Sequence, residues 1–386
     1  MKKRLISIII VLGFCVCFQI MHAQTWSSTK RLTWTTTNTY WPVVATDSNN
    51  NPYIVWIDRA ARDYIYFTKS TDSGTTWMAN KKLTWNNRDF VDPFLCVDSL
   101  NNLHLAWWKN DYTINQRDIH YKKSTNGGTT WTATKRVTWN LGATSEPIIA
   151  VNSGTNLHIV WSDLTYGNRE ILYKRSTDGG TTWFGLKRLT WNSGFSRDPY
   201  VVVDSSNTPH AVWYDDSSGK EEIYYKKSTD SGTTWFGFKR LTWNSGYSYT
   251  PCIAVAPDDS LHLVWRDSIP GNNEIFYKKS TDGGTTWFGF KRLTWNSGES
   301  EHPNISIGAD NNPQVVWSDN SPGNFEIMHR QSTDGGATWS GIKRLTWTSG
   351  ESRWAFISVD SANNPHVVWH DNTSGNYEIY YKKGIQ

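Results

Sequence analysis

The chain has 386 residues, with 39 Lys and Arg against 35 Asp and Glu. Three basic residues, Lys2, Lys3 and Arg4, belong to an N-terminal segment typical of a signal peptide, so the remainder carries 39 − 3 = 36 basic against 35 acidic side chains. A net charge of +1 provides no electrostatic basis for binding nucleic acid or an anionic membrane surface.

The first 23 residues have the pattern of a secretory signal peptide. A basic start is followed by an apolar run over residues 5–21 and by Ala23, after which we expect cleavage. No later segment is long and apolar enough to span a membrane, so we expect export of the mature chain, residues 24–386, to the periplasm or the medium. Two cysteines then remain, Cys96 and Cys252, which we expect to be small buried hydrophobes without a disulfide.

A repeat of about 52 residues organises the rest of the chain. A pentapeptide tag, K-R-L-T-W or a close variant, occurs at residues 30–34, 81–85, 135–139, 187–191, 239–243, 291–295 and 343–347. Each unit holds three tryptophans, and seven units account for 21 of the 24 in the chain. The high tryptophan content is therefore a property of the repeat.

Each unit is predicted to form four short antiparallel strands. In one unit these are residues 199–204, 209–213, 222–227 and 235–243, rich in β-branched and aromatic residues and separated by turn residues. Four strands per ~50 residues is typical of a propeller blade. The sequence therefore predicts an all-β, seven-bladed propeller forming one domain.

The chain ends predict how the ring closes. Residues 25–34 match the fourth strand of a blade, residues 40–347 contain blades one to six, and residues 354–383 supply three strands of blade seven. Pairing the two ends would leave no open blade edge. An open solenoid is the alternative, although it would need end caps that this sequence lacks.

An octapeptide of the form S-T-D-G-G-T-T-W recurs at residues 70–77, 124–131, 176–183, 228–235, 280–287 and 332–339. Its acid can accept turn N–H groups and its glycine can adopt positive φ, so we expect a structural turn between strands three and four. The motif resembles the Asp-box (BNR repeat) of bacterial sialidases and related propellers. The residues at the acid position are Asp72, Asn126, Asp178, Asp230, Asp282 and Asp334.

Two further rings of acids recur in nearly every unit. The acid of W-x-D comprises Asp58, Asp163, Asp215, Asp267, Asp319 and Asp371, and the acid that opens strand three comprises Asp118, Glu170, Glu222, Glu274, Glu326 and Glu378. We expect framework roles and no cofactor, with Ca²⁺ held by paired carboxylates as the alternative.

The positions that differ between units are the candidates for function. They are the two residues before the start of strand one, on the face opposite the Asp-box turns: Tyr40-Trp41, Val91-Asp92, Ser145-Glu146, Arg197-Asp198, Tyr249-Thr250, Glu301-His302 and Arg353-Trp354. Trp108, Arg88, Arg169, Arg266, Glu299 and Glu351 are further irregular residues on that face. The candidate ligand-binding residues are Tyr40, Trp41, Asp92, Trp108, Glu146, Arg197, Asp198, Tyr249, Glu301, His302, Arg353 and Trp354. The alternative is that these positions lie in solvent-exposed loops and vary by sequence drift, without a function.

The resemblance to sialidases implies an arginine triad, a tyrosine nucleophile with a glutamate partner, and an aspartate acid/base. This chain could offer Arg88, Arg197 and Arg353, with Tyr40 or Tyr249, Glu301, and Asp198 or Asp92. It departs from the family in lacking the R-I-P-type sequence, in its seven predicted blades where sialidases have six, and in the uniformity of its units, which leaves little room for long inserted loops. We therefore expect a secreted, non-catalytic protein that binds a carbohydrate or surface polymer, with a sialidase-like hydrolase as first alternative and a protein-interaction scaffold as second.

Overall fold

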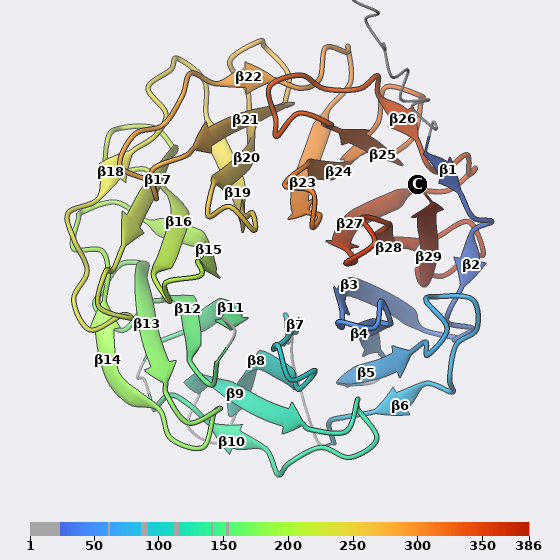
Figure 1. The fold of residues 1–386 in the computed structure, drawn as a ribbon, viewed down its shortest axis with the longest axis horizontal. Helices are drawn as coiled ribbons and strands as arrows, with labels where there is room; N and C mark the ends of the chain where they lie inside the picture. Colours follow the sequence, from blue (N-terminus) through green and yellow to red (C-terminus); the bar gives the residue numbers. More distant parts are fainter. Residues whose placement is uncertain are drawn as a thin grey trace, which may run out of the picture.

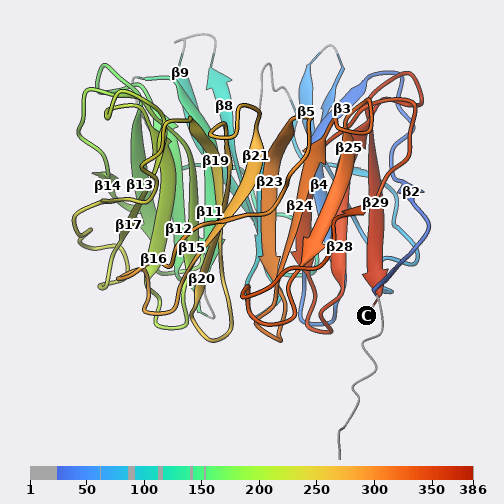
Figure 2. The same ribbon diagram turned by 90° about the horizontal axis from the view of Figure 1, so that it is seen from above.

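The fold is a closed wheel of seven β-sheets around a central axis (Figure 1). The computed structural model describes residues 24–60, 62–85, 92–111, 116–139, 142–151 and 154–385, and these contain strands and no helix. Seen from the side, the sheets stand around the axis between two faces formed by the turns (Figure 2). The predicted signal peptide and Arg88 lie outside the described residues.

Each blade has four antiparallel strands, ordered from the axis outward. Blades one to three are β3 (Asn38–Thr46), β4 (Pro52–Arg59), β5 (Asp63–Lys69) and β6 (Lys81–Lys82); β7 (Phe94–Val97), β8 (Leu103–Asp111), β9 (Gln116–Ser124) and β10 (Lys135–Arg136); and β11 (Thr144–Val151), β12 (Leu157–Asp163), β13 (Glu170–Ser176) and β14 (Phe184–Arg188). Blades four to six are β15 (Ser196–Val203), β16 (Pro209–Asp215), β17 (Glu222–Lys227) and β18 (Lys239–Arg240); β19 (Ser248–Val255), β20 (Leu261–Asp267), β21 (Glu274–Ser280) and β22 (Lys291–Arg292); and β23 (Ser300–Ile307), β24 (Pro313–Asp319), β25 (Glu326–Gln331) and β26 (Lys343–Arg344).

Blade seven joins the two ends of the chain, as the sequence predicts. Its first three strands are β27 (Ser352–Val359), β28 (Pro365–Asp371) and β29 (Glu378–Ile385), and its outer edge is β1 (Thr25–Trp26) with β2 (Lys30–Arg31). The β1 strand pairs Trp26 with Gly384, and the β2 strand pairs Arg31 with Tyr380. The prediction of a ring closed by the N-terminal strand is confirmed, and the solenoid alternative is wrong.

The hydrophobic core lies between neighbouring blades. The second strand of a blade is covered on both sheet faces, so the side chains on both of its sides are buried instead of alternating between core and solvent. In β24, for example, every residue is buried, and Trp317 packs with Cys252 and Val264 of the preceding blade. Each blade therefore completes the core of the next.

The fourth strand is shorter than the sequence indicates. Residues 235–243 have the composition of one strand, but β18 contains only Lys239 and Arg240. After the turn, the Phe236 N–H donates to the Lys227 carbonyl (3.1 Å), and the chain then leaves the ladder until residue 239. This strand has a neighbour on one side only, and a short edge strand limits the number of unpaired backbone groups.

The repeated octapeptide forms a tight turn held by its acid. The Asp178 carboxylate accepts the Thr182 N–H (2.8 Å) and hydroxyl (2.6 Å), and the Ser176 hydroxyl accepts the Gly180 N–H (2.9 Å). Asn126 makes the corresponding bond from Thr130 N–H in blade two (2.8 Å). The turn is therefore held by hydrogen bonds among residues of the motif itself.

Candidate functional site

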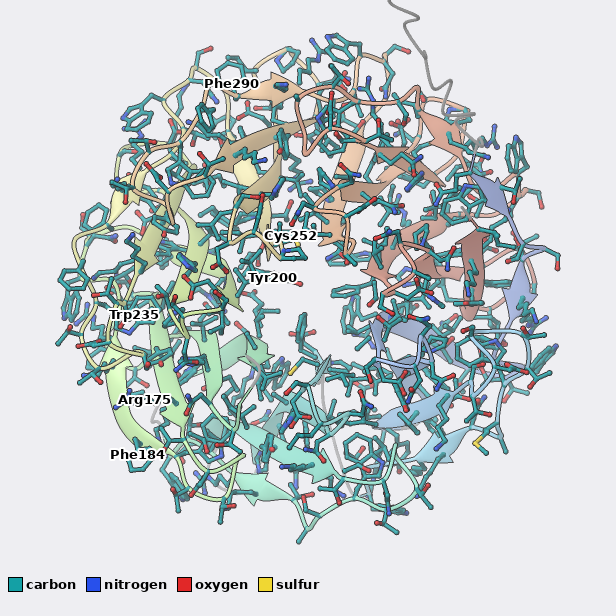
Figure 3. All side chains as sticks on the ribbon, in the orientation of Figure 1. Arg175, Phe184, Tyr200, Trp235, Cys252 and Phe290 are labelled. Atoms are coloured by element: carbon teal, nitrogen blue, oxygen red, sulfur yellow. The ribbon has the colours of Figure 1, made fainter. Side chains whose placement is uncertain are left out.

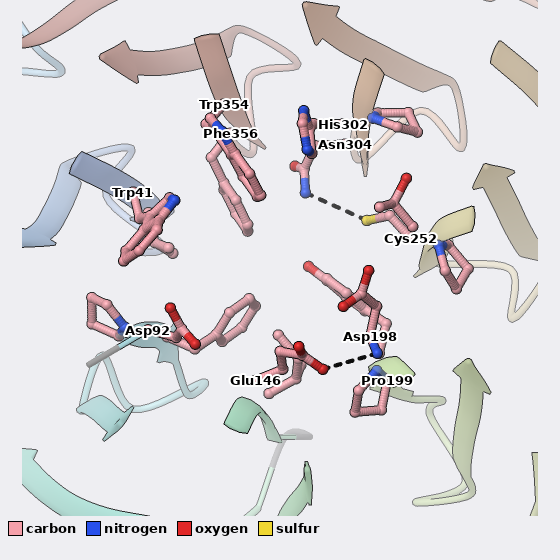
Figure 4. Close-up of a pocket in the computed structure, with 18 of the residues that line it drawn as sticks. Trp41, Asp92, Glu146, Asp198, Pro199, Cys252, His302, Asn304, Trp354 and Phe356 are labelled. Atoms are coloured by element: carbon pink, nitrogen blue, oxygen red, sulfur yellow. Dashed lines mark hydrogen bonds between the residues drawn. The ribbon is translucent and has the colours of Figure 1, made fainter. Parts of the chain in front are cut away.

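A cavity of about 340 Å³ lies on the axis, at the end of the wheel opposite the octapeptide turns (Figure 4). Every blade contributes three consecutive residues from the start of its innermost strand, such as Asp198, Pro199 and Tyr200. The side chains of Tyr200 and Cys252 point toward the central opening (Figure 3). The seven blades therefore share one central site.

In six of the seven blades a β-bulge aims the first residue of the triplet at the axis. In six blades this residue is not glycine yet has φ between 46° and 57°, and the register of the inner strand slips at the same point. The six residues are Trp41, Glu146, Asp198, Thr250, His302 and Trp354. Non-glycine residues adopt this conformation at a cost of about 1 kcal/mol or more. The same strained backbone thus presents five types of side chain from six blades.

Three consecutive blades present carboxyl groups to the cavity. The Asp198 N–H donates to the Glu146 carboxylate (3.0 Å), and Trp108 Nε1 donates to Asp92 (2.8 Å). Burial raises the pKa of Glu146 to about 8, and the neighbouring Asp198 adds to that shift. Burial also raises the pKa values of Asp92 and Asp198. We call Asp92, Glu146 and Asp198 the acidic arc.

The opposite side of the same ring is aromatic. The His302 and Trp354 rings stack with centroids 3.7 Å apart, and Trp41 meets Trp354 edge-on at 6.3 Å. Burial lowers the pKa of His302 to about 3, so its imidazole is neutral near pH 7. We call Trp41, His302 and Trp354 the aromatic arc.

In the six predicted pairs whose first residue the structure describes, that residue lies outside the cavity lining. Glu301 forms ion pairs with Arg266 (3.2 Å) and Arg353 (3.5 Å), and Arg353 also pairs with Glu351 (3.0 Å). Among the others, the Tyr40 ring is 5.1 Å from that of Tyr377, the Tyr249 ring is 5.3 Å from that of Tyr214, and the Arg197 guanidinium is 5.0 Å from the Phe195 ring. Arg197 and Arg353 belong to blades four and seven.

The sequence analysis did not identify the part of the cavity lining that is formed by the third residue of each triplet. Its lining includes Phe94, Tyr200, Cys252, Asn304 and Phe356, each two residues beyond the bulge. The alternation of side chains along a strand, shifted by a bulge at its start, is the signal that could have indicated these residues. Cys252 is buried and unpaired as predicted, but it also lines the cavity, where its sulfur accepts a hydrogen bond from Asn304 (3.4 Å).

The repeated acids bond to nearby framework groups. Asp215 accepts the Ser196 hydroxyl (2.5 Å) and Asn192 amide (2.7 Å), while Glu170 pairs with Arg188 (2.6 Å). Among the described residues, no group of three His, Cys, Asp or Glu side chains is placed to hold a metal ion. Those residues also hold no helix long and apolar enough to cross a membrane.

Comparison with known proteins gives similarity in fold and distant sequence similarity to curated xyloglucanases. No family model matches the chain. A xyloglucanase, Xgh74A of Acetivibrio thermocellus, is 25% identical over 313 residues, which are 73% of this chain and 34% of the xyloglucanase. The chain thus spans about a third of the length of that relative.

The solved structures that resemble the chain include sialidase-type propellers. A protein of unknown function from Dyadobacter fermentans has a TM-score of 0.60 at 13% identity, covering 94% of this chain and 98% of that one. The Hadza microbial sialidase Hz136 has a TM-score of 0.55 at 14% identity, covering 86% and 76%. A PL25 ulvan lyase has a TM-score of 0.63 at 9% identity, covering 91% and 95%. At such identities, these similarities show the β-propeller fold.

Proposed function

We propose that the axial cavity binds a sugar residue of an extracellular glycan without transforming it. The observation that carries this proposal is the division of one ring of equivalent positions into an acidic arc and an aromatic arc. An aromatic face stacks on the C–H surface of a sugar, while carboxyl groups accept hydrogen bonds from its hydroxyls. The volume of about 340 Å³ is within the range of small-molecule sites.

The charges around the cavity favour a sugar with hydroxyl or ammonium groups. The cavity lining has three carboxyl groups and no Lys or Arg among the described residues, and His302 is neutral. A carboxylated sugar such as sialic acid would bring a fourth acid beside the acidic arc. The sialidase-like alternative has less support, because Arg197 and Arg353 lie outside the lining and Arg353 is paired with Glu301 and Glu351.

The similar proteins support a glycan as the ligand. The names of the curated relative and of two similar structures are those of a xyloglucanase, a sialidase and an ulvan lyase. An extracellular glycan also agrees with the signal peptide expected from residues 1–23. A periplasmic or secreted location is therefore part of this proposal.

A glycan array followed by titration calorimetry tests the binding. Trp354→Ala removes one wall of the aromatic arc and should weaken affinity by at least about tenfold, the loss expected when one sugar–aromatic contact of ~1.4 kcal/mol disappears. Phe288→Ala removes a half-exposed aromatic ring on the outer circumference and should leave the affinity unchanged. Equal affinity of Trp354→Ala and wild type would overturn the proposal, and so would an array that shows no binding, which would favour the scaffold alternative.

Glycoside hydrolysis is a second candidate, favoured by the state of Glu146. A carboxyl group with a pKa raised to about 8, beside Asp92 and Asp198, has the properties of a general acid paired with a carboxylate. Fluorogenic glycosides, sialosides included, test this alternative. Turnover lost in Glu146→Gln would make the protein an enzyme, and sialoside turnover lost in Arg197→Ala or Arg353→Ala would make it sialidase-like. Binding without turnover supports the non-catalytic function.

A further inference from the structure

The three tryptophans of each repeat have three different environments. Those on the second strand are fully buried, and those of the octapeptide are half-buried against an aromatic or imidazole ring of the preceding blade. The tag tryptophans are instead 61–71% exposed, and they are Trp34, Trp85, Trp139, Trp191, Trp243, Trp295 and Trp347. An indole so exposed adds little to the core, so its repetition needs another explanation than packing.

The tag tryptophans lie on the outer edge of the wheel, one at each junction between neighbouring blades. In Figure 3 the circumference carries the labelled residues Phe184 and Phe290, far from Tyr200 and Cys252 at the axis. Each tag tryptophan follows the outermost strand of its blade, as Trp347 follows β26. We call the place where a tag tryptophan meets the third strand of the next blade an outer junction.

Two anchored cations hold the indole at an outer junction. The Arg344 guanidinium is 5.7 Å and Lys382 Nζ of the next blade 5.6 Å from the centroid of Trp347. Arg344 is fixed by Glu326 (2.7 Å) and the Thr346 carbonyl (2.6 Å). Cation–π contact at an exposed site contributes roughly 0.5–1 kcal/mol and orders the ring before any ligand arrives.

Six outer junctions also hold a cation that no carboxylate balances. Lys382 donates to the Leu345 carbonyl (2.8 Å) and makes no ion pair with any described residue. The same position is Lys122, Lys174, Lys226, Lys278 and Arg330 at the other five, each bonded to the equivalent carbonyl. At the seventh junction, beside Trp34, it is Thr68. Exposed indoles thus coincide six times around the wheel with a positive charge outside any ion pair among the described residues, and at three junctions the cation itself, Lys122, Lys226 or Lys278, is buried beside the indole.

We propose that these six outer junctions are equivalent subsites for an acidic polysaccharide. Each would stack one sugar ring on its indole and place that sugar's carboxylate or sulfate near the cation of the next blade. One indole gives a weak contact, but several on one wheel can engage one polymer, so avidity rises without any new contact. This site is separate from the axial cavity and does not depend on its function.

Immobilised polygalacturonate, alginate and dextran sulfate test the proposal, with fully methyl-esterified polygalacturonate as the uncharged match. Wild type should bind an acidic polymer, bind the ester at least about tenfold more weakly, and lose affinity as NaCl rises, because salt screens the attraction between the polymer's charges and the cations of the junctions. Binding to none of the acidic polymers, or equal binding to the ester, would overturn the proposal. Equally tight binding to vesicles of anionic lipid would assign the surface to membranes instead and overturn it as well.

Single and multiple tryptophan variants distinguish binding by several weak subsites from binding by one strong site. Trp347→Ala alone should weaken binding less than about threefold, whereas changing Trp191, Trp243, Trp295 and Trp347 together should weaken it more than about tenfold. Trp34→Ala is the matched control, because its junction has Thr68 in place of the cation, and it should have no effect. Lys382→Met and Lys278→Met together keep the aliphatic stems and should reduce the preference for the acid over the ester.

Two further controls keep the result interpretable. The tag indoles are mostly exposed and each cation–π contact contributes only roughly 0.5–1 kcal/mol, so the single tryptophan variants should keep the Tm of the wild type within about 2 °C and the fourfold variant should still unfold cooperatively. Trp354→Ala in the axial cavity should retain polymer binding, which separates a failure here from a failure of the axial function. A fourfold tryptophan variant that folds and binds the polymers like the wild type would refute the subsites.

Discussion

Gly232→Ala should destabilise the wheel, because the glycine of the octapeptide has a role at the blade interface. Gly232 has φ +85°, and an added Cβ would lie 1.7 Å from Oη and 2.5 Å from Cζ of Tyr173 in the preceding blade. Tyr173 is fully buried, its hydroxyl is bonded to His158 (2.7 Å), and Trp235 packs edge-on against its ring at 4.9 Å. The ring therefore has no free space into which it could move.

The size of the effect follows from two costs. Left-handed backbone costs an L-residue about 1–2 kcal/mol, and overpacking costs about 1–3 kcal/mol. For the 386 − 23 = 363 residues after the predicted signal peptide, an unfolding entropy of ~2.1 cal/mol/K per residue converts a loss of ~3 kcal/mol into a Tm about 4 °C lower. Differential scanning calorimetry measures this shift directly.

A control in the same blade makes the test decisive. A Cβ added at Gly237 would meet no heavy atom within 4 Å, and the φ of this glycine is outside the left-handed region, so Gly237→Ala should leave Tm unchanged or slightly higher. Combining Gly232→Ala with Tyr173→Phe removes the nearest clashing atom, so the double variant should be less destabilised than the sum of the single variants. Equal Tm values for Gly232→Ala and Gly237→Ala would refute the reasoning.

Three other predictions concern carboxyl groups of the turns, the cavity and the W-x-D positions. Hydrogen bonds within the turn hold the pKa of Asp178 at about 2, below its unfolded value of ~3.9, so its stabilisation is present above pH 4 and lost as pH falls toward 2. Asp178→Asn should keep the Tm near pH 7, because Asn126 accepts the equivalent N–H bond from Thr130 in blade two, while Asp178→Ala lowers it; equal losses would contradict this role. Because the pKa of Glu146 is raised, the free energy of unfolding should fall as the pH rises from about 4 to about 8. Glu146→Gln should therefore be more stable than wild type at pH 8 but not at pH 4, and thermal melts across this range measure the difference. EDTA should leave Tm unchanged, because side chains bond to the W-x-D carboxylates such as Asp215; a lower Tm would instead support the Ca²⁺ alternative.

The sequence by itself determined the architecture and the way the ring closes. The seven tags, the strand-forming segments between them and the complementary ends are local patterns, and local hydrogen bonding and side-chain alternation are encoded in short stretches of chain. The octapeptide turn is similarly local, since Asp178 bonds to groups no more than four residues away. The fold could therefore be predicted in detail, except for the length of the fourth strands.

Only the tertiary structure decided which residues share a site. The sequence marks both members of each variable pair, but the bulge turns one of them toward the axis, so that Asp198 lines the cavity and Arg197 does not. Repetition also makes the three tryptophans of a unit look alike, although Trp317 is buried and Trp347 is exposed. The physical reason is that cavity and burial depend on how the seven blades sit against one another, and no single repeat carries that arrangement.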